Sequence, residues 1–131
     1  MGIRDVIAGI LEAELTQPVA VYASPVEVNV IPAVVVAPDG GEYIVPISFG
    51  RDGRAEAVRI GFRIQILESR AIPEVALDRL EDRRKEITDA LAQIAGAQWI
   101  AFVDIGEAEV AGVKAIGGTV TVTIRMGDDG V

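Results

Sequence analysis

Residues 50–54, with the sequence Gly-Arg-Asp-Gly-Arg, combine positive side chains with glycines that leave backbone amides open. This combination could bind an anion through Arg51 and Arg54, with Asp52 between them. A polar stretch flanked by glycines is also typical of a turn between two strands. The chain contains no Gly-x-x-x-x-Gly-Lys sequence, so it has no phosphate loop of that kind. We therefore predict that residues 50–54 form the tip of a hairpin.

Three acidic residues, Asp104, Glu107 and Glu109, offer oxygen atoms that could bind a hard cation. Calcium loops, however, use a tighter spacing of carboxylates with a glycine at a fixed position. On a strand, alternation would direct Asp104 to the opposite face from Glu107 and Glu109. We therefore expect these residues to be charges that face solvent, with no metal and no cofactor.

The composition limits the chemistry further. The chain has 131 residues and contains neither cysteine nor histidine, which excludes disulfides, thiol nucleophiles, Cys/His zinc sites and histidine-based catalysis. A net charge of −8 disfavours binding to nucleic acid and to anionic membranes. The start of the chain lacks the pattern of a signal peptide. We expect a soluble protein that is not an enzyme.

The clearest structural pattern is a strand at residues 58–67, where apolar residues alternate with residues suited to the other face of a sheet. A short amphipathic helix is expected at residues 3–15, on a stripe formed by Ile3, Val6, Ile7, Ile10 and Leu11. Further strands are expected at residues 19–22, 26–30, 33–37, 42–49, 99–105 and 119–126. The strands cluster and are joined mostly by short turns. This order predicts an α+β fold, with a mostly antiparallel sheet and both helices on one face. We expect a single domain at residues 1–131, ending in a flexible acidic tail at 127–131.

Residues 73–94 have a helical period, with Pro73 at the first position and Gly96 after the end. An apolar seam is expected along this helix at Leu77, Leu80, Ile87, Leu91 and Ile94. Arg84 stands where the seam requires another apolar residue. Its side chain either extends past its neighbours to water or reaches a carboxylate on a partner subunit. The mixed charges of residues 81–86 are typical of a solvated helix face or of an interface with ion pairs.

Other segments predict surfaces that another chain could cover. Residues 106–118 are rich in glycine and alanine and show only weak alternation. In the strand at 119–126, Thr119, Thr121 and Thr123 alternate with apolar residues. The threonines lie either on an exposed face or along an edge that pairs with another chain. Trp99 is expected to pack at the end of a strand.

Several short sequences resemble those of a known family, namely Ile-Pro-Ala-Val-Val-Val at 31–36, Pro-Asp-Gly at 38–40, Tyr-Ile at 43–44 with Pro46, and Leu-Asp-Arg-Leu at 77–80. Together with the order of the expected elements, they resemble the tail terminator proteins of long-tailed bacteriophages of the actinobacteriophage type. The resemblance covers nearly the whole chain.

The resemblance implies a structural virion protein that is assembled in the host cytoplasm. Such subunits form a ring, expected to be a hexamer, on the head-proximal end of the tail tube. The ring stops polymerisation of the tube and joins the head connector, and DNA passes through its opening. The implied partners are therefore copies of the chain, the tail tube protein and the head–tail connector or neck protein. As candidate interface residues we name Arg51, Asp52, Arg54 and Arg84.

Two alternatives remain open at this point. The first is another structural protein of the same particle, such as a head–tail connector, neck or tail-completion subunit. The second is a small-molecule binding module, which would require a concave pocket with converging polar groups.

Overall fold

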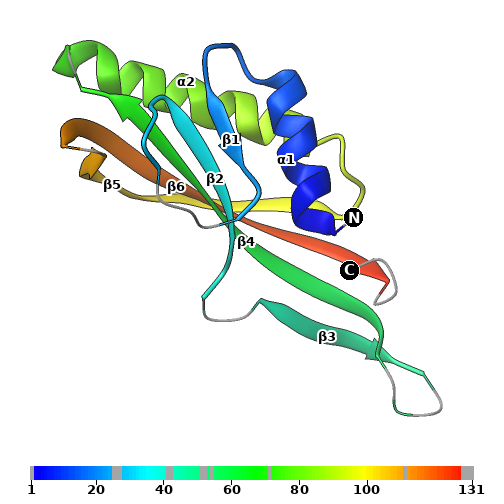
Figure 1. Cartoon of the computed structure of the whole chain (residues 1–131). Coiled ribbons are helices and arrows are strands. Elements are labelled where there is room, and N and C mark those ends of the chain that lie inside the picture. Colours follow the sequence, from blue (N-terminus) through cyan, green and yellow to red (C-terminus); the bar gives the residue numbers. More distant parts are fainter. Residues whose placement is uncertain are drawn as a thin grey trace.

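The computed structural model describes residues 2–24, 28–40, 43–50, 53, 55–70, 72–110 and 112–127. The elements of these residues, shown in Figure 1, are α1 (Ile3–Glu14), β1 (Ala20–Tyr22), β2 (Ala33–Pro38), β3 (Ile44–Phe49), β4 (Ala55–Ser69), α2 (Pro73–Leu91), β5 (Ala97–Val110) and β6 (Val113–Gly127). The chain therefore has the α+β fold that its sequence predicts. Of the predicted tail, residues 128–131 lie outside the described residues.

The described strands form one sheet, in which every neighbouring pair except β1 and β2 is antiparallel. The central strand, β4, pairs with β6 from Ala57 opposite Gly127 to Ser69 opposite Ala115. The other side of β4 is shared by β3 along its first half and by β2 along its second half. β5 pairs with β6 alone and therefore forms an outer strand of the sheet.

Both helices pack against the same face of the sheet (Figure 1). This face is apolar because alternate residues of the central strands point toward the helices. The buried ones are Val58, Ile60, Phe62, Ile64 and Ile66 on β4 and Val120, Val122 and Ile124 on β6. The predicted alternation of the long strand is confirmed. Each such buried side chain contributes about 1.5–3 kcal/mol to folding.

The buried stripe of α1 differs from the predicted one. Its buried residues are Ile3, Ile7, Ala8 and Leu11. The prediction for Val6 was wrong, because this side chain is 41% exposed. Successive residues of a helix are about 100° apart around the axis, so Val6 falls beside the contact line formed by Ile3, Ile7 and Leu11.

The packing side of α2 also differs from the predicted seam. Its buried residues are Ala76, Leu80, Arg83, Ile87, Ala90 and Leu91. Leu77 is 42% exposed, and the basic residue in the seam is Arg83 rather than Arg84. A seam that runs from Leu80 to Ile87 can pass through position 83 or 84 with the same i+3 and i+4 steps. The spacing alone therefore did not distinguish the two arginines.

Of the glycine-rich segment, residues 106–110 belong to β5 and residues 113–118 to β6, and the two stretches pair with each other. A side chain at Gly118 would place its Cβ atom 2.7 Å from two ring atoms of Phe102. Glycine is therefore required where the aromatic ring of one strand lies over the backbone of the other.

The strand expected at residues 26–30 is absent from its described part, residues 28–30. Because β1 and β2 are parallel, the chain between them has to cross over instead of forming a hairpin. Val28 and Ile31 of this connection pack against Ala33 and Leu67. These contacts cover one end of the sheet face that carries no helix.

Candidate assembly surfaces

The β3–β4 hairpin projects beyond the helices (Figure 1). Three of the candidate interface residues, Arg51, Asp52 and Arg54, come between β3 and β4 in the sequence and lie outside the described residues. On β3 itself, Ile44 and Phe49 are 44% and 62% exposed. The described part of the projecting hairpin therefore presents apolar side chains to solvent.

Arg84, the fourth candidate interface residue, lies beside the outer strand β5. Its guanidinium carbon is 4.9 Å from the centroid of the Trp99 ring, a cation–π arrangement. The two side chains border a hollow of about 510 Å³ that is also lined by Lys85, Thr88, Asp89, Leu91, Ala92 and Ala97. Trp99 remains 48% exposed. Arginine and tryptophan are the residue types that dominate many protein interfaces, so the hollow is a candidate contact surface.

The strand β5 has no partner on its outer side within the described residues. Its first half, residues 97–103, contains no charged residue. Along the strand, Trp99, Ile100, Val103 and Ile105 are 48%, 55%, 37% and 50% exposed. A long apolar edge strand pairs readily with another chain unless charges, prolines or bulges prevent it. The register between β5 and β6 is irregular after Trp99 and again after Val103, which disfavours backbone pairing along this edge. The exposed apolar side chains of β5, rather than its backbone, are therefore the candidate contact surface.

Two of the three acidic residues of β5 form ion pairs with arginines. Asp104 has a φ of 57° at an irregularity in the β5–β6 register, and its carboxylate lies 2.5 Å from Nη2 of Arg63. Glu107 pairs with Arg70. The Asp104 and Glu107 side chains are 63% and 70% exposed, so the expectation that they face solvent is confirmed. Within the described ranges, no cluster of three or more acidic residues is arranged to hold a metal ion.

The face of the sheet opposite the helices carries arginines and threonines on its two central strands. Arg59 of β4 lies directly opposite Arg125 of β6, and Arg63 lies opposite Thr121. Gly61 separates the two β4 arginines on this face and lies opposite Thr123. We call Arg59, Arg63, Thr121, Thr123 and Arg125 the arginine face. A hollow of about 280 Å³ lies beside it, lined by Asp39, Arg59, Gly61, Ile100, Thr121, Val122 and Thr123.

The strand β6 lies between β4 and β5, so its threonines do not lie along an edge. Of the two alternatives for this row, the exposed face therefore applies to Thr121 and Thr123, which are partly exposed. Thr119, in contrast, is only 6% exposed. The contribution of Arg63 and Arg125 to this surface was not anticipated, because it depends on β4 and β6 being neighbours.

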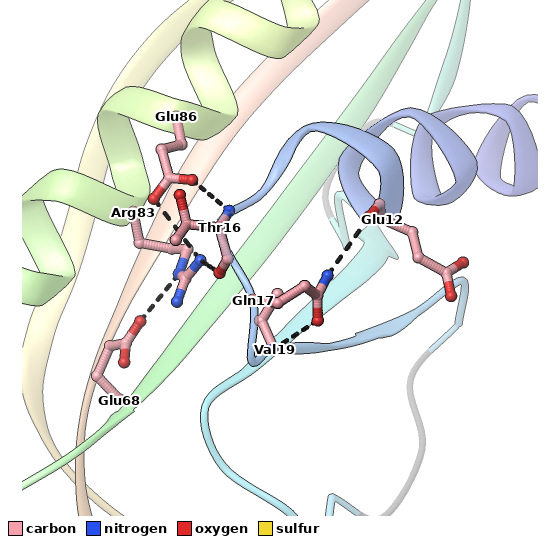
Figure 2. A network of polar contacts seen from close by, with 7 residues as sticks. All are labelled: Glu12, Thr16, Gln17, Val19, Glu68, Arg83 and Glu86. Atoms are coloured by element: carbon pink, nitrogen blue, oxygen red, sulfur yellow. Dashed lines mark hydrogen bonds and ion pairs between the residues drawn. The ribbon is translucent and has the colours of Figure 1, made fainter.

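Arg83 forms a buried polar network that sequence reasoning did not find (Figure 2). Its Nε atom donates to Glu68 of β4 at 3.0 Å, and its Nη1 atom donates to the Thr16 carbonyl at 2.6 Å. The backbone N–H of Thr16 in turn donates to the carboxylate of Glu86 at 2.6 Å. The network connects α2, β4 and the segment after α1. Its role is structural, since it joins three elements behind the surfaces described above.

No model of a known protein family matches this chain, and a search of curated proteins finds no match. Across the described ranges, no helix combines the length and apolar character that a membrane span requires.

Proposed function

We propose that this chain is a structural subunit of a bacteriophage tail that forms a ring on the head-proximal end of the tail tube. In this role it ends tube polymerisation and provides the surface for head–tail joining. The observation that carries the proposal is the outer strand β5, with its exposed Trp99, Ile100 and Ile105 and its uncharged first half. Exposed apolar side chains that lie together are typical of a surface that another chain covers.

The proposed partners are those that the resemblance to tail terminator proteins implies. Copies of the chain, expected to number six, meet through different surfaces of each copy, as a closed ring requires. The tube protein and the head–tail connector or neck protein bind the two ends of the ring. The net charge of −8 suits an opening through which DNA slides without binding.

Electron microscopy of tails made with and without this protein tests the proposal. Without it, we expect tubes of irregular length that do not join heads, and supplying the wild-type chain restores both properties. Tubes of normal length that join heads in its absence would contradict the proposal. Localisation of the protein at a different level of the particle would instead favour a neck or tail-completion subunit.

The tip of the β3–β4 hairpin provides a second test. Shortening residues 50–54 should leave the fold stable, because hairpin tips tolerate such changes. We expect the shortened chain to form rings poorly or to dock poorly on tails, since Arg51 and Arg54 are removed. A normal yield of infectious particles would show that the tip is only a connection.

A second candidate function, binding of a small molecule, is favoured by the hollow beside Trp99. Its volume of about 510 Å³ is of the size of ligand sites. Arg84 and Lys85 would favour an anionic compound with an aromatic ring that stacks on Trp99. Quenching of Trp99 fluorescence by a panel of aromatic carboxylates would distinguish this function from a purely structural one.

A further inference from the structure

The two halves of β4 differ in how far the sheet extends beside them. Along the second half of β4, β2 lies next to β4 and β1 lies beyond β2. Along the first half, β3 takes the place of β2, and none of the described strands lies beyond β3. The outer edge of β3 is therefore one strand short of the edge that β1 forms.

β3 is also apolar and uncovered. Its sequence, Ile-Val-Pro-Ile-Ser-Phe, contains no charged residue, yet no residue of the strand is buried. Phe49 is 62% exposed, the highest value among the large apolar side chains of the described ranges, and Ile44 is 44% exposed. We call Ile44 and Phe49 the β3 patch. An apolar strand that its own subunit leaves uncovered is typical of a surface that another chain covers.

A second apolar surface lies at the opposite edge of the sheet. It consists of Trp99, Ile100, Val103 and Ile105 of β5, which are 48%, 55%, 37% and 50% exposed and which we call the β5 patch. β4 and β6 separate β5 from β3 in the sheet, so one copy cannot bring its own two patches together. A second copy can do so. Neither β3 nor residues 97–103 carry a charge that such a contact would have to bury.

The strand directions suit this contact. β5 and β3 run in opposite directions, because every neighbouring pair in the row β3, β4, β6 and β5 is antiparallel. A second copy in the same orientation therefore brings its β5 antiparallel to β3. Because β3 lies level with β4 from Ile60 to Ala55, whereas Trp99 lies level with Phe62, the second copy has to shift by two to seven residues along the strands. This shift is about 7–23 Å, and such a stagger accompanies the tilt of strands in closed barrels.

We infer that the β3 patch of one copy packs against the β5 patch of the next copy. This inference rests on the proposed function, because it names the surfaces through which copies meet in the ring. The contact is made by side chains, since Pro46 and the irregular registers of β3 and β5 disfavour continuous backbone pairing. A contact between unlike surfaces forms a closed ring when the rotation between copies closes.

A charge placed on one patch at a time tests the contact. We expect Phe49→Lys on the β3 patch and Ile100→Lys on the β5 patch each to weaken self-association about tenfold or more, because charged groups are disfavoured at the centre of an interface. Sedimentation over a concentration series up to about 1 mM measures the association. Val6→Lys, at an apolar position of α1 that is 41% exposed, is the matched control and should associate like the wild type.

An equal mixture of Phe49→Lys and Ile100→Lys gives the sharpest result. Only one pair of intact patches remains in the mixture, so we expect dimers and nothing larger. If copies instead met through two β5 patches, Phe49→Lys alone would form dimers as readily as the wild type. If they met through two β3 patches, Ile100→Lys alone would do so. Either of these results would overturn the inference.

The absence of cysteine from the chain provides a second measurement, which captures the contact even where association is weak. A chain with both Phe49→Cys and Ile100→Cys should give a ladder of linked copies with a short bismaleimide. Each single substitution should leave the copies unlinked, because the same position of two neighbours lies far apart in a contact between unlike surfaces. Val6→Cys with Ile100→Cys is the control. Thermal unfolding of every variant establishes that the subunit itself is folded.

Trp99 reports the contact from the other copy. It is the single tryptophan of the chain and is 48% exposed, so its emission should shift to shorter wavelength as wild-type copies associate and the ring loses water. The shift should be absent in Phe49→Lys, although Phe49 and Trp99 lie at opposite edges of one copy. A shift that persists in this variant would contradict the inference.

The outcomes separate this inference from the proposed function. If tails made without the protein are irregular but the ladder of linked copies does not form, even with tail tubes present, the copies meet through other surfaces and the inference is wrong. If the mixture forms dimers and the ladder appears, but tails made without the protein are normal, the contact stands and the proposed function fails.

Discussion

The Nε atom of Arg83 lies 3.0 Å from Oε1 of Glu68, and the two side chains are only 10% and 3% exposed. This ion pair joins the middle of α2 to the end of β4. The same guanidinium also donates to the Thr16 carbonyl, so the segment after α1 is held at the same point (Figure 2). Arg83 therefore joins α2 both to the sheet and to the segment after α1.

Removing one partner of this buried pair should be costly. We expect Arg83→Ala to lower the free energy of unfolding by about 3–5 kcal/mol, because Glu68 then remains buried without a counter-charge. The double variant Arg83→Met, Glu68→Leu should be closer to the wild type, since the most deeply buried carboxylate is removed together with its partner, and only the more exposed Glu86 loses an ion pair. Urea unfolding followed by circular dichroism measures both changes. Arg79→Ala, at an exposed position of the same helix, is the control, and an equal loss in both single variants would contradict the prediction.

The contact between Gly118 and Phe102 predicts a different result for two glycines of one hairpin. In Gly118→Ala the new Cβ atom would lie 2.7 Å from the Phe102 ring, and overpacking of this kind costs about 1–3 kcal/mol. Gly106→Ala should be neutral, because a Cβ atom there meets nothing within 4 Å. Thermal denaturation compares the two variants. Equal melting temperatures would show that the ring moves aside without cost.

Under the proposed function, the exposed side chains of β5 should tolerate a charge in the isolated subunit but not in the assembled tail. Ile100 is 55% exposed, so Ile100→Lys should leave the melting temperature nearly unchanged. A lysine on an edge strand opposes pairing and docking by another chain, so the yield of complete tails should fall severalfold. Val113→Lys, at a position that is 54% exposed near the hairpin turn, is the control. Equal tail yields for the two variants would argue against β5 as a contact surface.

The contact between Arg84 and Trp99 can be followed directly, because Trp99 is the single tryptophan of the chain. Arg84→Gln should remove the cation–π contact, which is worth about 0.5–1 kcal/mol at exposed sites. Acrylamide should then quench the fluorescence of Trp99 more strongly. Lys85→Gln, at the neighbouring position, should leave the quenching unchanged. Quenching that is the same in Arg84→Gln and in the wild type would mean that Arg84 does not shield the ring.

The local parts of the fold could be predicted from the sequence where one pattern has one structural meaning. The alternation at residues 58–67 predicted which side of β4 faces the core, because successive residues of a strand point to opposite faces and the apolar ones all share one of them. Pro73 marked the start of α2 for a similarly local reason. The rotation of α2 was not predictable, since Arg83 and Arg84 both satisfy the spacing of the seam. The choice between them is made by Glu68, which lies on another element.

The candidate surfaces were predicted only in part, for the same physical reason. Arg84 was identified from its position in a helix, but its partner Trp99 lies on β5. The arginine face exists because β4 and β6 are neighbours in the sheet, which no local pattern encodes. The weak alternation of residues 106–118 gave no strand prediction, whereas Gly117 and Gly118 lie in β6 where a Cβ atom would meet neighbouring atoms closely.

β4 and β6 are adjacent in the sheet although α2 and β5 separate them along the chain. Contacts between distant residues form slowly, because a long loop has to close before they are made. During synthesis, β4 leaves the ribosome before β6 has been made. The edge of β4 that pairs with β6 therefore stays unpaired until the end of the chain is complete. Only molecules that have completed β6 can bury this edge, so a chain that ends before β6 should not reach the native fold.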